Sequence, residues 1–385
     1  LRRASETTEN IIRSCNQDIK PIYDNGLLEV QLGEWSGLTI EEVKSKFPND
    51  YEIWQKNPSD LEIKLNGEKY KPVQELFSQA NNFINKLIKK HPPSSNKTIL
   101  IVAHNAILRA LILNLIGKNS QGFRRLRLNN ASISIFNINK NQTNSIKVQI
   151  ECLNSTTHLE PAIPKKGNRS RIILVRHGET DWNLQGRFQG QIDIPLNKNG
   201  KHQALETSIF LSFIKFSKAY TSSMTRPRET AEIILGSNSE VELSIEKDLI
   251  EINHGLWEGK LESEIRNEWS NLLSKWQNSP EKVDMPEGEN IEQVAKRSIN
   301  CWNKIGKSLS PNETALIVAH DAVNKTILCN LLGLKSSDIW MIKQGNGGVS
   351  VIEVASDSNE PSVISCLNLT SHLGSLLDTT ATGAL

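Results

Sequence analysis

Short apolar runs alternate with amphipathic stretches in the second half of the chain. Strands are predicted at five places: Ile172–Val175, Lys218–Ser222, Ala315–Ala319, Val349–Val354 and Ser362–Leu367. Apolar positions at three-to-four spacing predict helices near Lys201–Ile214, over Arg226–Leu235, from Ile291 to Leu309 and over Ala322–Leu332. Strands that alternate with helices in this way indicate a three-layer α/β sandwich, with helices on both faces of a mostly parallel sheet.

Four blocks of this pattern occur twice in the same order, which indicates a tandem duplication. The clearest pair is Leu100–Ala106 (LIVAHNA) and Leu316–Ala322 (LIVAHDA). The other pairs are Arg3–Thr7 with Arg226–Thr230, Leu28–Gly37 with Ile250–Gly259, and Glu151–Leu159 with Ser365–Leu373. The period is about the length of a domain, so a solenoid is not expected.

The repeat also predicts the domain boundaries. Residues 170–374 are expected to form a complete domain, followed by a C-terminal tail over residues 375–385. A stretch rich in Pro, Lys and Gly, residues 160–169, is expected to be a linker. Residues 1–159 are expected to form an N-terminally truncated domain, since nothing in them matches the run that ends in Arg176-His177-Gly178. We expect this domain to be inactive by itself and to lean on its neighbour or expose an unpaired strand edge.

Composition narrows the class of protein. The net charge is +2 and charges of both signs are interleaved, so neither nucleic acid nor a membrane is expected as a partner. No apolar run reaches the roughly 20 residues that a membrane helix needs. The five cysteines are scattered and form no C-x-x-C pair, which favours reduced thiols in the cytosol over a disulfide framework or a zinc site. A cytoplasmic globular protein is therefore expected.

The most informative residues follow predicted strands directly. Arg176 and His177 come after Ile172–Val175, and His320 comes after Ala315–Ala319. Ligands of α/β proteins bind at the carboxyl ends of the strands, so these side chains are expected to share one site. A guanidinium binds phosphate oxygens in pairs, and a neutral imidazole can attack phosphorus to form a phosphohistidine. We therefore expect Arg176 to bind a phosphate and His177 to be the nucleophile.

Three further residues fit the same chemistry. Arg226 stands where a strand passes into a helix, and it is the second candidate for binding the anion. His320 opens a helix, where backbone N–H groups and the helix dipole favour a phosphate. Glu251 is the candidate proton donor to a leaving alkoxide, while a helix- or turn-capping role stays open for it.

Other kinds of site have weaker support. His177, His254, His320 and Glu251 could ligate a metal, but no H-E-x-x-H or similar spacing occurs and two nearby arginines would repel a cation. No glycine-rich loop opens a helix after a strand. The run Gly345-Asn346-Gly347-Gly348 precedes a strand and is expected to be a turn. Neither a metal nor another cofactor is expected.

The run Arg176-His177-Gly178-Glu179-Thr180, together with Asn183, resembles the opening signature of the histidine phosphatase superfamily, the phosphoglycerate mutase-like proteins. This resemblance implies the fold of that family. It also implies that His177 is phosphorylated and that Glu251 is the general acid. The residues implied to hold the phosphoryl group are Arg176, Asn183, Arg226 and His320.

The resemblance extends over the second repeat and, in truncated form, over the first. In the first repeat only Arg3, Glu29 and His104 match residues of the expected site. The tandem layout is similar to that of cyanobacterial and plant proteins likened to 2-carboxyarabinitol-1-phosphate phosphatase.

The spacing of the site residues favours a phosphatase. Mutases of the family carry a long insert that closes over the site, whereas Glu251 and His320 are only 69 positions apart, which resembles the shorter phosphatase branch. The run Pro286–Glu289 before a helix also resembles that branch. We expect a hydrolase that cleaves a small phosphorylated metabolite through phospho-His177. The alternatives are a phosphoglycerate mutase and a non-enzymatic sensor of phosphate esters.

Overall fold

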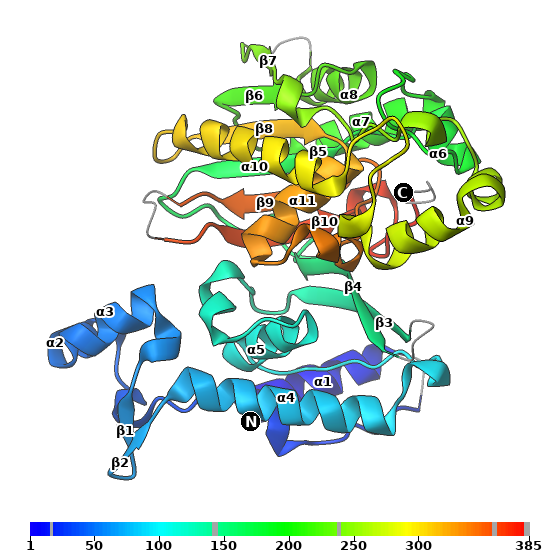
Figure 1. Ribbon diagram of the computed structural model, residues 1–385. Coiled ribbons are helices and arrows are strands. Elements are labelled where there is room, and N and C mark those ends of the chain that lie inside the picture. Colours follow the sequence, from blue (N-terminus) through cyan, green and yellow to red (C-terminus); the bar gives the residue numbers. More distant parts are fainter. Residues whose placement is uncertain (16–17, 141–144, 237–239, 356–359, 381–385) are drawn as a thin grey trace. The chain divides into compact units, whose positions relative to one another are not determined.

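The computed structural model describes residues 1–15, 18–140, 145–236, 240–355 and 360–380. The chain forms two compact units (Figure 1). Unit 1 consists of Leu1–Asn130 and Ile138–Val148, and unit 2 consists of Ala131–Asn137 and Gln149–Leu385. These units are defined by spatial contacts, so the domains expected from the repeat stay a prediction. Residues 381–385 of the expected tail lie outside the described residues.

Unit 2 is built on a mixed sheet with the strand order β3-β4-β10-β9-β5-β8-β6-β7. The strands are β3 (Ile133–Lys140), β4 (Ile146–Ser155), β5 (Arg171–Arg176), β6 (Lys218–Thr221), β7 (Leu243–Ile245), β8 (Thr314–Ala319), β9 (Val349–Glu353) and β10 (Val363–Leu369). The pairs β5–β8, β8–β6 and β6–β7 are parallel, whereas β9 is antiparallel to β5 and β10. The α/β sandwich predicted from the pattern is confirmed.

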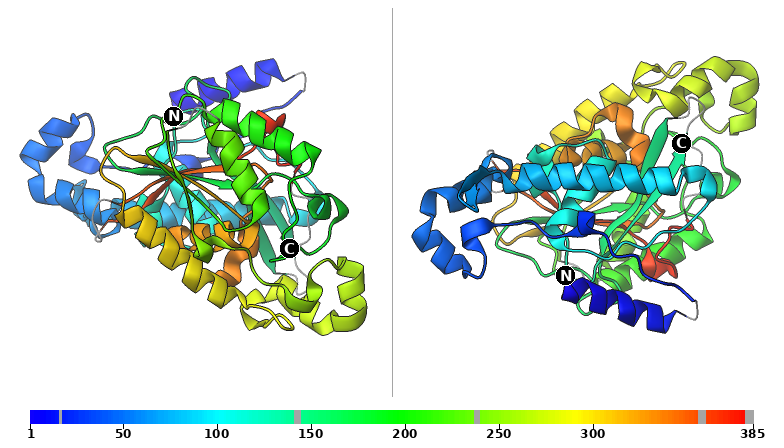
Figure 2. Two further views of the ribbon diagram at one scale, coloured as in Figure 1. Left: turned by 90° about the horizontal axis from the view of Figure 1, so that it is seen from above. Right: turned by 90° about the horizontal axis from the view of Figure 1, so that it is seen from below.

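Helices cover both faces of the sheet (Figure 2). One face carries α7 (Lys198–Leu211) and α8 (Thr225–Leu235), and the other carries α10 (Ile291–Lys307) and α11 (Asp321–Leu332). Every residue of β5 and β8 is buried. Continuous burial explains why these strands are apolar without alternation, as in other sheets covered on both sides. The remaining α-helices of this unit among the described residues are α6 (Asp181–Gln185) and α9 (Glu262–Asn278).

Two predicted helices differ from their observed bounds. Helix α7 begins before the expected start because the Asn197 side chain accepts a hydrogen bond from Gly200 N and caps the helix at that point. Helix α10 ends at Lys307, so Leu309 is buried outside it. The turn expected at Gly345–Gly348 is present, and Gly347 has the positive φ of +71° that favours glycine.

Strand β4 meets β10 through equivalent residues of the two repeats. Leu153 pairs with Leu367 in antiparallel register. The Asn154 side chain donates to Ser365 O, and the Asn368 side chain donates to Glu151 O. Both asparagines have a φ of +53°, a left-handed conformation that asparagine adopts more readily than most residues. Each of these equivalent asparagines therefore donates to the equivalent backbone carbonyl of the other repeat.

Unit 1 is mainly helical. Its helices are α1 (Arg2–Ser14), α2 (Ile40–Lys46), α3 (Pro48–Lys56), α4 (Pro72–Lys90) and α5 (Asn105–Leu115), and β1 (Ile63–Leu65) and β2 (Glu68–Tyr70) form a hairpin. Helices α4 and α5 pack together, and the buried side of α4 is formed by Val73, Leu76, Ala80 and Ile84. No helix in the described ranges is long and apolar enough to cross a membrane.

The repeated pentapeptide LIVAH has different structures in the two units. In unit 2 it ends β8, and Leu316–Ala319 are 0% exposed between β5 and β6. In unit 1 the identical residues Leu100–Ala103 form no strand, although this segment is described. Leu100 is 64% exposed. Of the two outcomes expected for this half, an exposed strand edge is therefore not seen at this segment; Ile101, Val102 and Ala103 are half-buried in an irregular segment.

Candidate active site

Two parallel strands bring the candidate histidines together. Arg176 and Ala319 are partners in the β5–β8 register, and His177 N donates to Ala319 O at 3.0 Å. His177 and His320 each follow these residues by one position. Their ring centroids are 5.3 Å apart in an edge-to-face arrangement. The carboxyl ends of β5 and β8 thus place both imidazoles at one point of the sheet.

The His177 ring is held with one nitrogen directed at an arginine. Its Nδ1 lies 2.7 Å from Gly178 O, so Nδ1 carries the proton and donates it to this carbonyl. Its Nε2 then has a lone pair, and it accepts a hydrogen bond from Arg226 Nε at 3.3 Å. Burial holds the pKa of His177 well below its usual value, and the charges of Arg226 and Arg176 lower it further. The imidazole is therefore neutral, as a nucleophile must be.

Two arginines act on the His177 ring, Arg226 through a hydrogen bond and Arg176 through its charge. Arg226, in the first turn of α8, is fully buried, and its Nη2 donates to Gly190 O at 2.8 Å. Burial lowers the pKa of Arg226 to about 10, which still leaves it charged at neutral pH. Arg176 Nη1 donates to Gln344 O at 2.6 Å and lies 3.3 Å from Asp321 Oδ1. Arg176 Nε has no partner within the part of the chain that the structure describes, so this edge is available to an anion.

His320 stands at the N-cap position of α11, and its ring contacts a serine. Its Nε2 lies 2.9 Å from the Oγ of Ser222, the residue directly after β6. Burial lowers the pKa of His320 well below its usual value, and the nearby charge of Arg226 lowers it further. His320 Nδ1 is buried and has no partner among the described residues. A neutral His320 can therefore offer one hydrogen bond to a ligand without adding charge to the site.

Glu251 lies at the start of the same helix. Its Oε1 accepts from Ile252 N at 2.9 Å, and its Oε2 accepts from Ala322 N, in the first turn of α11, at 3.4 Å. The capping role that the sequence left open is thus present in the structure. Burial raises the pKa of Glu251, and the charge of Asp321 raises it further. A capping position and a proton-donor role are compatible, because a carboxyl group with a raised pKa retains its proton at higher pH.

Asn183 is linked to the nucleophile through a residue that sequence reasoning missed. Asn183 Oδ1 accepts from Thr180 N at 3.2 Å in a capping box at the start of α6. Asn346 Nδ2 lies 3.3 Å from this oxygen and also donates to His177 O at 3.1 Å. Asn346 belongs to the glycine-rich turn before β9. In the sequence, only its place in the glycine-rich run Gly345–Gly348 set it apart.

The structure adds Ser222, Asp321, Gln344 and Asn346 to the predicted site residues. Ser222 could have been found, because it follows β6 as His320 follows β8. Asp321 could also have been found, because it directly follows His320, whereas Gln344 and Asn346 contact the site from a segment whose approach depends on the fold. No group of three or more His, Cys, Asp or Glu side chains suited to a metal ion occurs in the described ranges.

Unit 1 contains a partial counterpart of this arrangement. The Glu29 carboxylate accepts from Ala106 N and Ile107 N, both at 3.2 Å, and so caps α5 as Glu251 caps α11. His104 is buried at the N-cap of α5, and burial lowers its pKa. Arg3, on α1, is exposed. We find no counterpart of Arg176 or His177 in the described residues of unit 1.

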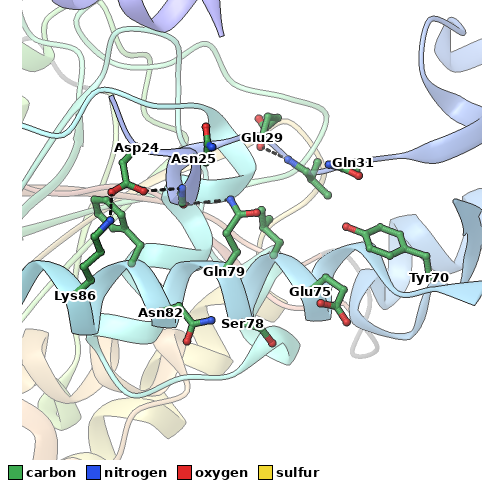
Figure 3. Close-up of a pocket in the computed structure, with 14 residues that line it drawn as sticks. Asp24, Asn25, Glu29, Gln31, Tyr70, Glu75, Ser78, Gln79, Asn82 and Lys86 are labelled. Atoms are coloured by element: carbon green, nitrogen blue, oxygen red, sulfur yellow. Dashed lines mark hydrogen bonds and ion pairs between the residues drawn. The ribbon is translucent and has the colours of Figure 1, made fainter. Parts of the chain in front are cut away.

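A pocket of about 550 Å³ lies beside Glu29, between α4 and residues 24–31 (Figure 3). Lys86 pairs with Asp24 at 2.8 Å across this pocket. Gln79 Nε2 donates to Gly26 O at 3.2 Å and to Leu28 O at 2.9 Å. Figure 3 shows these side chains reaching from α4 toward the segment that carries Glu29.

The same framework supports Glu251 in unit 2. Lys304 pairs with Glu246 at 3.0 Å, in the positions of Lys86 and Asp24. Arg297, in the position of Gln79, donates to Asp248 O at 3.0 Å and to Ile250 O. Arg297 also donates to Glu251 O at 3.0 Å. Both units therefore anchor the glutamate segment to the following long helix through the same backbone carbonyls.

Comparison with known proteins gives matches along most of the chain. The family described as histidine phosphatase superfamily (branch 1) matches residues 1–151 and 172–366. Phosphoserine phosphatase 1 of Hydrogenobacter thermophilus is 35% identical over 206 residues, which are 53% of this chain and 94% of that protein. The 2-carboxy-D-arabinitol-1-phosphatase of Triticum aestivum is 33% identical over 215 residues, 54% of this chain but only 42% of the wheat protein.

Mutases and a solved structure also match. A 2,3-bisphosphoglycerate-dependent phosphoglycerate mutase of Cytophaga hutchinsonii is 30% identical over 198 residues, covering 50% of this chain and 92% of that protein. The solved structure of Bacillus stearothermophilus YhfR is 30% identical and aligns with a TM-score of 0.47, covering 50% of this chain and 94% of that one.

Proposed function

Because the chain belongs to branch 1 of the histidine phosphatase superfamily, we propose that unit 2 hydrolyses a small phosphorylated metabolite through a phosphohistidine on His177. The observation that carries this proposal is the neutral, buried His177 Nε2 with Arg226 Nε 3.3 Å away. This nitrogen is both nucleophilic and next to a group that binds phosphate oxygens.

The arrangement accounts for each step of hydrolysis. A phosphate monoester binds to Arg176 and Arg226. Arg226 Nε then donates its hydrogen bond to a phosphate oxygen and no longer to His177 Nε2. Asn183 and His320 contact the remaining phosphate oxygens. His177 Nε2 then forms a bond to phosphorus as the bond to the ester oxygen breaks, and Glu251 donates its proton to that oxygen. The alcohol leaves, and Glu251 is now a carboxylate.

The second step returns the site to its starting state. The Glu251 carboxylate takes a proton from a water molecule whose oxygen attacks the phosphohistidine. The P–N bond breaks, inorganic phosphate leaves and His177 is again neutral. No metal or cofactor enters either step, since the arginines stabilise the charge on the phosphoryl group.

The principal alternative is a phosphoglycerate mutase. Relatives include proteins named as mutases as well as phosphatases. Glu251 and His320 are 69 positions apart, a spacing without the long insert that closes over the site in mutases. This spacing favours the phosphatase, because water can then reach the phosphohistidine. Incubation of 3-phosphoglycerate with and without 2,3-bisphosphoglycerate separates the two activities. Isomerisation that needs the bisphosphate and releases no phosphate would contradict the proposal.

The names of relatives support a substrate class for unit 2. Phosphoserine, 2-carboxyarabinitol 1-phosphate and 3-phosphoglycerate are small alkyl phosphates that carry a carboxylate, and the first two appear in the names of relatives. We propose a substrate of this kind for unit 2. Phosphate release from a panel of these compounds, with 4-nitrophenyl phosphate as an aryl reference, ranks the candidates.

Substitution of the nucleophile tests the proposed function. His177→Ala is expected to lower kcat/KM for every active ester of the panel by about 10³-fold or more, because it removes the proposed acceptor of the phosphoryl group. His202→Ala is the matched control, since His202 lies on α7 with a side chain that is 66% exposed. A wild-type chain that binds phosphate esters without cleaving any would instead support the sensor alternative. Unchanged hydrolysis by His177→Ala would show that the nucleophile is another group.

Two further features belong to this proposal. A tandem duplication is supported by the equivalent contacts of Glu29 and Glu251 and by the family match to both halves of the chain. A cytosolic location is supported by Cys152 and Cys301, which are buried thiols without a disulfide. Cell fractionation with an antibody to the chain tests the location.

A further inference from the structure

Asp321 places a buried carboxylate beside the site, and no step of the proposed reaction uses it. It is the first residue of α11 and is 3% exposed. Its Oδ1 lies 3.3 Å from Arg176 Nη1, and its Oδ2 lies 2.6 Å from Lys325 Nζ. The Lys325 ammonium is itself 5.0 Å from the centre of the Trp340 ring. Asp321 therefore joins a phosphate-binding arginine to a buried lysine.

This carboxylate is unfavourable for phosphate binding. A buried charge loses its hydration, a free-energy cost that pairing only partly offsets. A negative charge next to Arg176 also repels the phosphate that Arg176 is expected to bind. A residue at this position therefore calls for an explanation other than affinity for the substrate.

The fold itself does not require a charge at this position. In unit 1 the equivalent residue is Asn105, and Arg109 occupies the position of Lys325. Asn105 Nδ2 donates to Leu128 O at 2.6 Å, and α5 still begins at this residue. A neutral amide is thus compatible with the start of this helix, so Asp321→Asn is expected to fold.

Asp321 and Glu251 occupy the same helix end. Glu251 Oε2 contacts the N–H of Ala322, the residue that follows Asp321. Two adjacent buried carboxyl groups do not both ionise readily. Asp321 pairs with two cations, whereas Glu251 accepts from two backbone N–H groups. The negative charge of Asp321 favours the protonated form of Glu251.

We propose that Asp321 is a positioning residue that fixes one edge of Arg176 and, by its charge, keeps Glu251 protonated for donation to the leaving group. The inference rests on the proposed phosphatase function. The other charged groups facing Glu251 are Arg226 and Arg176, which act in the opposite direction, while His177 and His320 are neutral. In agreement with the geometry, burial raises the pKa of Glu251 and Asp321 is the next largest cause.

The pH dependence of hydrolysis tests this role. Glu251 must be protonated to donate, so kcat/KM falls as the pH rises through its pKa. Neutralising Asp321 lowers that pKa, so Asp321→Asn is expected to move the alkaline limb of kcat/KM to lower pH. The substrate is the alkyl phosphate of the panel that the wild type hydrolyses fastest. With 4-nitrophenyl phosphate the limb is expected to stay in place, because nitrophenolate leaves without a proton.

Two variants distinguish the effect of the Asp321 charge on the pH dependence from a structural effect of the substitution. Asp321→Glu keeps the charge and is expected to retain the wild-type limb even if kcat changes. Asp284→Asn removes a carboxylate from an exposed position and controls for net charge. An unmoved limb in Asp321→Asn, or equal shifts in Asp321→Asn and Asp321→Glu, would overturn the inference.

A spectroscopic titration makes the test independent of turnover. The infrared carbonyl band of a protonated carboxyl group, obtained by subtracting the Glu251→Gln spectrum, reports the proton on Glu251 directly. This band is expected to disappear at lower pH in Asp321→Asn than in the wild type. An identical titration in both proteins would overturn the inference, whereas a wild type without hydrolysis of any ester would contradict the proposed function alone.

Discussion

Burial of side chains governs the chemistry of the site residues. His177 and His320 are neutral because a buried imidazolium would lose its hydration next to two guanidinium groups. Arg226 stays charged in the same surroundings because the pKa of an arginine, even when lowered to about 10, is far above neutrality. Desolvation thus acts on all three groups, yet only the arginine keeps a charge. The result is a neutral nucleophile in a cationic site.

The proton on Glu251 leads to a prediction about leaving groups. Glu251→Gln cannot donate a proton to an alkoxide, so kcat/KM for the best alkyl phosphate is expected to fall by about 10²-fold or more. Hydrolysis of 4-nitrophenyl phosphate is expected to fall far less, since its leaving group is stable as an anion. Phosphate release from both esters measures the ratio.

The first repeat provides the matched control for this variant. Glu29→Gln changes the equivalent residue, which caps α5 in a unit where we find no nucleophile. It is expected to leave both activities unchanged. An equal loss on the alkyl and the aryl ester in Glu251→Gln would assign Glu251 a structural role only.

At the scale of elements, the two LIVAH segments show that neighbours decide strand formation. Leu316–Val318 pair with β5 on one side and β6 on the other. Leu100–Ala103 have the same side chains and the same β propensity, but the described structure gives them no strand partners. A strand gains its stability from ladder hydrogen bonds and from burial on both faces, and an isolated segment has neither.

Hydrogen exchange should distinguish the two copies within one sample. Amide protons of Leu100–His104 are expected to exchange about 100-fold faster, or more, than those of Leu316–His320, since local opening of the first segment breaks no ladder. Mass spectrometry of peptic peptides measures both rates. Protection in Leu111–Leu113, buried on α5, would show that unit 1 is folded. Equal protection of the two LIVAH copies would mean that the first is also a paired strand.

At the scale of the molecule, neutral buried histidines make stability depend on pH. The pKa of His254 is lowered to about 3 and that of His372 to about 4, both chiefly by burial. Neither nitrogen of His254 has a hydrogen-bond partner among the described residues, and its ring lies edge-on to Phe188 and Trp276. The unfolded chain, with ordinary histidine pKa values near 6.5, binds more protons than the folded one below that pH.

The free energy of unfolding is therefore expected to fall as the pH drops below about 6.5. His254 alone accounts for about 2 kcal/mol between pH 7 and pH 5, since one pKa unit corresponds to about 1.4 kcal/mol. His254→Leu, which installs the residue found at the equivalent position 32, is expected to remove this part of the slope. Urea unfolding of wild type and variant, followed by tryptophan fluorescence at pH 7 and pH 5, measures it. An unchanged slope would mean that His254 is protonated in the folded chain.

Much of the fold was predictable from local patterns. Strands β5, β6 and β8 and helices α8 and α11 lie within a residue or two of their predicted bounds, because apolar runs and helical periodicity are local properties. The candidate residues Arg176, His177 and His320 were found in the same way, since each directly follows a strand. The proximity of the two histidines followed from a general property of parallel sheets.

The sequence by itself determined the class of fold, the repeat and the residues that can carry the chemistry. Only the tertiary structure decided that LIVAH is a strand in one unit and irregular in the other, because pairing depends on neighbours distant in the chain. It also brought Gln344 and Asn346 to the site from the segment before β9, where no sequence signal marked them as site residues. Burial, which no local pattern specifies, decided that His177 is neutral and that the pKa of Glu251 is raised.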